Sequence, residues 1–130
     1  MMRMWLAVGV LVGSMSGAGA DVSGEWFVAG TFDAASAATR AERRADLVCA
    51  FTERGGGLSG TCRPPSAPEG AAITGRVRDR DVEWRFDIAL APGREKETVV
   101  YRGRLDRERR RIRGAFRIAD LAGRFTAERW

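Results

Sequence analysis

The chain has 130 residues, enough for one domain. It carries 22 Lys and Arg against 17 Asp and Glu, and it has no histidine, which excludes His-based catalytic triads and His metal sites. Apart from Lys96, every basic residue is an arginine. Such an excess of arginine can mark a surface that binds nucleic acid or an anionic membrane. Because acidic residues are interspersed with the arginines, we interpret them instead as the solvated outer wall of the domain.

Residues 1–20 have the pattern of a secretory signal peptide. Arg3 supplies the positive start, 5–12 is a short apolar run, and the Ala-Gly-Ala at 18–20 suits cleavage. A retained membrane anchor is the alternative, but a span needs ~20 apolar residues. We therefore expect a mature domain of 21–130, periplasmic or secreted, with no transmembrane segment after cleavage. Export argues against a nucleic-acid partner.

The first strand is expected at 24–32, where Trp26, Val28 and Gly30 share one face. The following stretch, 33–44, is rich in alanine and lacks glycine and proline, and Asp33 can cap a helix. This pattern predicts one short helix between the first and second strands. A disordered loop is the alternative.

Two further strands are predicted at 46–54 and 57–63, turning at the two glycines between them. Counting back from that turn places Cys49 opposite Cys62, on a non-hydrogen-bonded pair whose Cα atoms approach to ~4.5 Å. That distance suits a disulfide. Since these are the only cysteines of a chain expected to be exported, we predict a structural bridge. A redox role would favour a C-x-x-C spacing, which is absent.

The rest of the chain alternates apolar and polar residues with the period of half-buried strands. One hairpin is predicted from 71–78 and 81–90, and it places Gly75 opposite Trp84. Three more strands follow within 99–130. A two-residue turn before Leu121 places Gly123 opposite Phe116. Large rings facing glycines are typical of a strongly curved sheet.

The pattern therefore predicts an all-β domain of eight strands, joined mostly by short connections. An antiparallel up-and-down β-barrel fits this organisation best. A two-sheet β-sandwich is the alternative.

The Gly-Glu-Trp at 24–26 resembles the G-x-W motif of the calycins, the group of ligand-binding barrels that includes lipocalins and avidins. The G-x-L-x-G-x-C stretch at 56–62 resembles an avidin-type hairpin. The resemblance implies that Trp26 packs against a basic residue of the last strand, for which Arg129 has the required parity. The second lipocalin motif and the polar residues that hold biotin in avidins are missing, so the family's ligand does not carry over.

Several inward residues are candidates for lining a cavity: Trp26, Trp84, Phe86, Tyr101 and Phe116. We expect a non-enzymatic binding protein that holds a small apolar ligand inside the barrel. The alternative is a filled core, with loops on a disulfide-stapled barrel contacting a protein partner. Glu53 could do acid–base chemistry with a second carboxylate, but we interpret it as an exposed rim residue. No cofactor, metal or catalytic site is expected.

Overall fold

The computed structural model describes residues 21–33, 44–89 and 93–130. Eight strands make up most of this part of the chain: β2 (Gly24–Phe32), β3 (Leu47–Arg54), β4 (Gly57–Arg63), β5 (Ala71–Arg78), β6 (Asp81–Ala89), β7 (Lys96–Leu105), β8 (Arg111–Ile118) and β9 (Leu121–Arg129). The predicted signal peptide lies outside the described residues. So does the helix expected at 33–44, except for its two end residues.

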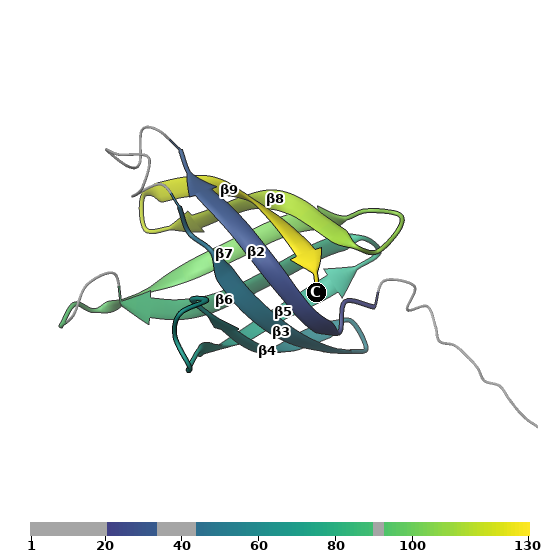
Figure 1. Ribbon diagram of the computed structural model, residues 1–130, viewed down its shortest axis with the longest axis horizontal. Coiled ribbons are helices and arrows are strands. Elements are labelled where there is room, and N and C mark those ends of the chain that lie inside the picture. The colour runs from purple at the N-terminus through teal and green to yellow at the C-terminus, as the bar shows by residue number, and fades with distance from the viewer. Residues whose placement is uncertain (1–20, 34–43, 90–92) are drawn as a thin grey trace, which may run out of the picture.

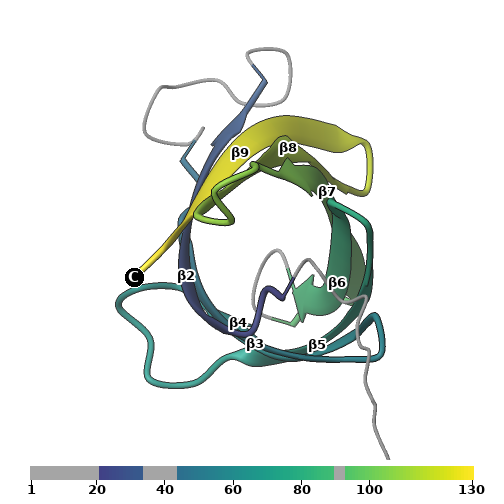
Figure 2. The same ribbon diagram turned by 90° about the vertical axis from the view of Figure 1, so that its right-hand side faces the viewer.

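The strands close into an antiparallel barrel in the order of the sequence, from β2 to β9 (Figures 1 and 2). Closure is made by β2, which pairs with β3 on one side and with β9 on the other. This confirms the up-and-down barrel and excludes the two-sheet sandwich. Within the described residues, no helix has the length and apolar character needed to cross a membrane.

The predicted pairings between neighbouring strands are confirmed. Cys49 faces Cys62 across β3 and β4, Gly75 faces Trp84 across β5 and β6, and Phe116 faces Gly123 across β8 and β9. The strand periodicity fixes these pairs, because a slip of one residue would turn every apolar side chain outward.

Glycines on the inner face make room for the rings of the core. Gly103 and Gly114 face each other across β7 and β8, and a Cβ built at Gly103 would lie 2.9 Å from Cζ of Phe125. Similarly, a Cβ at Gly123 would lie 2.5 Å from Cζ of Phe116. The small barrel can therefore hold these large rings because the positions that face them are glycines, which have no side chain.

Candidate functional site

The interior is occupied by aromatic side chains. The five residues expected to line a cavity are all buried, none more than 6% exposed: Trp26, Trp84, Phe86, Tyr101 and Phe116. Trp84 stacks on Tyr101 with ring centroids 5.0 Å apart, and Tyr101 stacks on Phe116 at 5.2 Å. Phe51 and Phe125 contact Trp84 from two further strands. These contacts join β3, β6, β7, β8 and β9 through one aromatic cluster.

This interior holds few polar groups. Among the described residues, no polar or charged residue is buried. Burial raises the pKa of the Tyr101 hydroxyl well above its usual range, so this hydroxyl stays neutral. The indole Nε1 of Trp84 is buried and has no hydrogen-bond partner in the part of the chain that the structure describes. Among the described residues of the interior, a charged ligand would therefore find no counter-charge.

One end of the barrel is closed around Arg129. Its guanidinium lies over Trp26, with Cζ 4.5 Å from the ring centroid, and it donates hydrogen bonds to the backbone oxygens of Ser23 (2.7 Å) and Asp21 (2.9 Å). Its Nε donates to the backbone oxygen of Arg109 at 3.1 Å. Arg129 therefore ties the segment before β2 to the last strand and to the connection before β8, a structural role.

The other residues singled out in the sequence also have structural roles. Cys49 and Cys62 form the predicted disulfide, and both are buried. Glu53 accepts a hydrogen bond from the backbone N–H of Val22 at 2.9 Å, and its own N–H donates to Ser23 Oγ. Glu53 is therefore a half-buried anchor for the segment before β2, and not the exposed rim residue that the sequence predicts. Among the described residues, no group of His, Cys, Asp and Glu could hold a metal ion.

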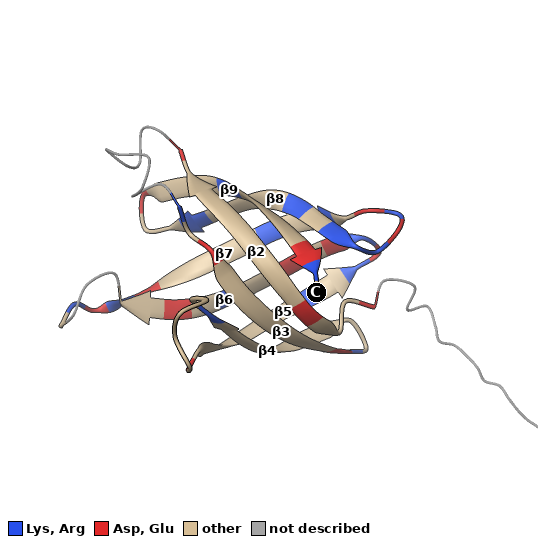
Figure 3. Cartoon of the chain, in the orientation of Figure 1, with Lys and Arg blue, Asp and Glu red and all other residues tan. Residues whose placement is uncertain are grey.

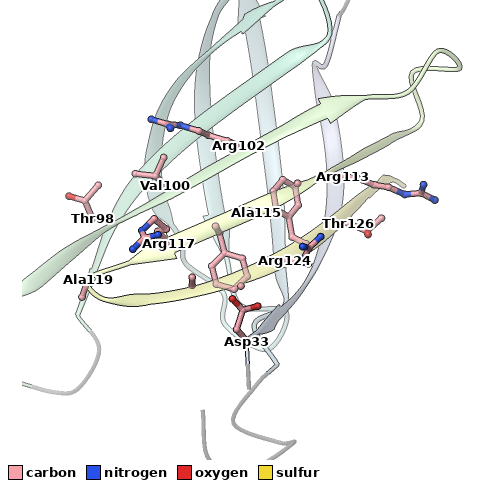
Figure 4. A pocket seen from close by; sticks show the side chains of 15 residues that line it. Asp33, Thr98, Val100, Arg102, Arg113, Ala115, Arg117, Ala119, Arg124 and Thr126 are labelled. Carbon is pink, nitrogen blue, oxygen red and sulfur yellow. The ribbon is translucent and has the colours of Figure 1, made fainter. Parts of the chain in front are cut away.

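One recess lies outside the aromatic core, on the outer wall formed by β7, β8 and β9. Its volume is about 1100 Å³, and its lining includes Arg102, Arg113, Ala115, Arg117 and Arg124. Figure 4 shows Ala115 among the four labelled arginine side chains. The strands present mainly alanine, glycine and threonine here. Long arginines thus stand around a floor of small residues, and this difference in side-chain length produces the hollow.

Strand register explains this arrangement. Ala115 on β8 is paired with Arg102 of β7 on one side and with Arg124 of β9 on the other. Arg113 and Arg117 lie two residues before and after Ala115 on the same strand, so they project from the same face. Four arginines therefore surround a single alanine. We call this group, Arg102, Arg113, Arg117 and Arg124 around Ala115, the arginine cross.

Three members of the arginine cross differ in their ion pairing from Arg104 and Arg111 of the same wall. Arg104 lies 3.6 Å from Asp81, and Arg111 lies 2.7 Å from Glu128. Within the cross, Arg102 lies 3.6 Å from Glu83. The other three arginines of the cross form no ion pair with any described residue.

The cross therefore has a concentrated positive charge. Among the described residues that line the hollow, Asp33 is the single carboxylate, against four arginines. Figure 3 shows the basic residues along β8 and β9. All four arginines of the cross are solvent-exposed, so they can reach an external anion. The sequence pattern had suggested only a solvated wall, because the period-two pattern places arginines outward without showing which of them meet across strands.

The chain matches no protein-family model and no curated protein. Function must therefore be argued from the chemistry of the site and not from the fold, since one barrel architecture serves many functions.

Proposed function

We propose that the protein is an exported, non-enzymatic binding protein that holds anionic groups at the arginine cross. The single observation that carries this proposal is the arrangement of four exposed arginines around Ala115. Three of them lack an acidic partner among the described residues. In this proposal the aromatic core makes the barrel a rigid scaffold, and the outer wall makes the contact.

Guanidinium groups suit this role for a specific chemical reason. Each presents a planar fork of N–H donors that matches phosphate, sulfate or carboxylate oxygens in a two-point contact. The guanidinium group of arginine is also not deprotonated in proteins. Mounting the four side chains on three paired strands supports recognition, because the backbone positions are held by the barrel before the ligand arrives.

Location outside the cytoplasm is part of the proposal. Two features support it: the signal-peptide pattern of residues 1–20 and the Cys49–Cys62 disulfide, which is stable in oxidising compartments. We propose the periplasm or the secreted fraction.

A second candidate is the small apolar ligand inside the barrel. The buried Trp84 Nε1 favours it, because an unpaired donor could meet an acceptor on a ligand. The ring contacts of Trp84 with Phe51, Tyr101 and Phe125 favour the filled core instead, since the centroids are only 5.0–5.4 Å apart. We therefore propose anion binding at the outer wall as the main function, and binding of an apolar ligand in the interior as the second candidate.

The proposal is tested by calorimetric titration with tripolyphosphate, a compact polyanion. We expect saturable binding to the wild-type protein. A triple variant, Arg113→Gln with Arg117→Gln and Arg124→Gln, should bind at least about tenfold more weakly, because three charged donors are lost.

A control with the same change in net charge separates the site from the overall basicity of the protein. Arg54, Arg76 and Arg78 lie on β3 and β5, away from the hollow, and they form no ion pair with a described residue. Changing all three to glutamine should weaken binding by no more than about threefold, since distant charges are screened. Equal losses in the two triple variants would refute the proposed site.

A further inference from the structure

We infer that the natural partner at the arginine cross is an anionic polysaccharide, a hydroxyl-rich sugar chain that carries sulfate or carboxylate groups. This inference rests on the proposed function. It adds the class of partner, which follows from the dimensions of the cross, from the side chains around it and from the side chains it lacks.

The dimensions favour a chain over a single small anion. Arg102 and Arg124 are separated by two strand spacings, which amounts to ~10 Å between backbones. Arg113 and Arg117 are four residues apart on one strand, which amounts to ~13 Å. The hollow between them measures about 1100 Å³. One phosphate or sulfate group would leave most of it empty, whereas several linked anionic groups can engage the four arginines together.

The side chains between the arginines favour sugars. Thr126 of β9 is paired with Arg113, and Thr98 of β7 also lines the hollow. Hydroxyl groups can donate and accept hydrogen bonds, as the hydroxyls of a sugar ring require. The hydroxyl group of Thr98 already donates a hydrogen bond to the carboxylate of Asp87 at 2.7 Å. The Thr98 hydroxyl oxygen therefore remains available as an acceptor. A ring lying over Ala115 would thus meet charge on four sides and hydroxyl groups near the rim.

Nucleic acids fit this surface less well. Proteins that bind single strands stack bases on exposed aromatic side chains. The outward residues of β7, β8 and β9 within the hollow are Arg, Ala, Val and Thr, and the two phenylalanines that line it, Phe116 and Phe125, are at most 3% exposed. The described residues of the hollow therefore offer no exposed ring to a base. Export of the chain also separates it from cellular nucleic acid.

Membranes and acidic proteins fit less well for a related reason. Amphipathic membrane-binding surfaces bury large apolar side chains below the headgroups, and protein interfaces concentrate aromatic residues and methionine at their centre. Among the described residues, the exposed large apolar side chains are Ile88 and Trp130, and neither lines the hollow. In addition, a flat bilayer would touch the arginine tips without reaching Ala115.

The test is a parallel titration of the full-length mature protein with five probes. These are a heparin-derived decasaccharide, a decamer of galacturonic acid, a neutral maltodextrin, a decamer of deoxythymidylate, and vesicles of equal parts phosphatidylcholine and phosphatidylglycerol. We expect one or both anionic oligosaccharides to bind at least about tenfold tighter than the neutral sugar, the oligonucleotide and the vesicles. The Arg113, Arg117 and Arg124 triple glutamine variant should lose at least about tenfold of this binding, while the Arg54, Arg76 and Arg78 control should not.

Each other outcome has a defined meaning. If the oligonucleotide or the vesicles bind as tightly as the oligosaccharides, the partner class is wrong. The same holds if maltodextrin binds equally well, because charge then plays no part. If tripolyphosphate binds at the cross and neither anionic oligosaccharide does, the inference fails while the proposed function stands. If no anion binds at the cross, both fail.

Discussion

Replacing Arg129 by alanine should destabilise the barrel more than any other single arginine substitution on β9. Arg129 pairs with Trp26 where β9 meets β2. Its side chain donates three hydrogen bonds to backbone oxygens and covers the Trp26 ring. The backbone oxygens of Asp21 and Ser23, which precede β2, lose these donors in the variant.

The expected magnitude follows from these contacts. A hydrogen bond from a charged donor contributes ~1.5–3 kcal/mol when it is shielded, and the bond to Ser23 is partly buried while the other two are exposed. A cation–π contact contributes ~0.5–2 kcal/mol. Since neighbouring contributions do not add fully, we expect a loss of ~2–4 kcal/mol. For a domain of this size, that lowers the melting temperature by ~10–20 °C.

Far-UV circular dichroism during urea unfolding measures this loss directly. The control is Arg124→Ala, on the outward face of the same strand, which should change the free energy of unfolding by less than ~0.5 kcal/mol. Arg129→Lys should lower the free energy of unfolding by an amount between those of the two alanine variants, because lysine keeps the charge but lacks the planar guanidinium group. Indistinguishable unfolding curves for Arg129→Ala and Arg124→Ala would refute the role assigned to Arg129 in closing the barrel.

Three further predictions concern the wall and the core. Replacing both Cys49 and Cys62 by alanine should lower the free energy of unfolding by ~2–4 kcal/mol in chemical denaturation, and a mass spectrum of the exported protein showing two free thiols would contradict the bridge. Gly114→Ala should cost ~1–3 kcal/mol or more, because its Cβ would collide with the opposite strand, whereas Gly57→Ala, whose nearest contact would be 3.4 Å away, should cost far less in the same assay. Tyr101 is the only tyrosine and its pKa is raised by burial, so ultraviolet absorbance should show no phenolate near pH ~10, where free tyrosine titrates. Because only the unfolded chain ionises there, stability should fall as the pH rises above ~10, and reversible titration of the folded protein near that value would show that the ring is exposed.

The barrel could be predicted because period-two alternation is a local property of each strand. The alternation of Ile112, Gly114, Phe116 and Ile118 identifies the inner face of β8 without any knowledge of its neighbours. The disulfide pairing could also be predicted, because a two-residue turn at the adjacent glycines fixes the register of the hairpin that carries both cysteines. Antiparallel closure then brings the first and last strands together.

The candidate functional surface was harder to predict, because it depends in part on the register between two strands that a longer connection joins. Residues 106–110 link β7 to β8, and no two-residue turn fixes that pairing from sequence. Only the structure shows that Arg102 faces Ala115. The segment before β2 was missed for another reason: it lacks periodicity, so the burial of Val22 and its hydrogen bond to Glu53 have no signature in the sequence.

In the function that we propose, the barrel binds anions on its outer wall and not in its interior. A ¹H–¹⁵N NMR titration of the labelled protein with the heparin-derived decasaccharide tests it most directly, because each amide reports its own surroundings. We expect saturable shifts at the backbone N–H of Ala115 and at the N–H groups of the arginine cross, with the indole N–H of Trp84 unmoved. A saturable shift of the Trp84 indole, with Ala115 unchanged, would contradict the account and place the ligand inside the barrel.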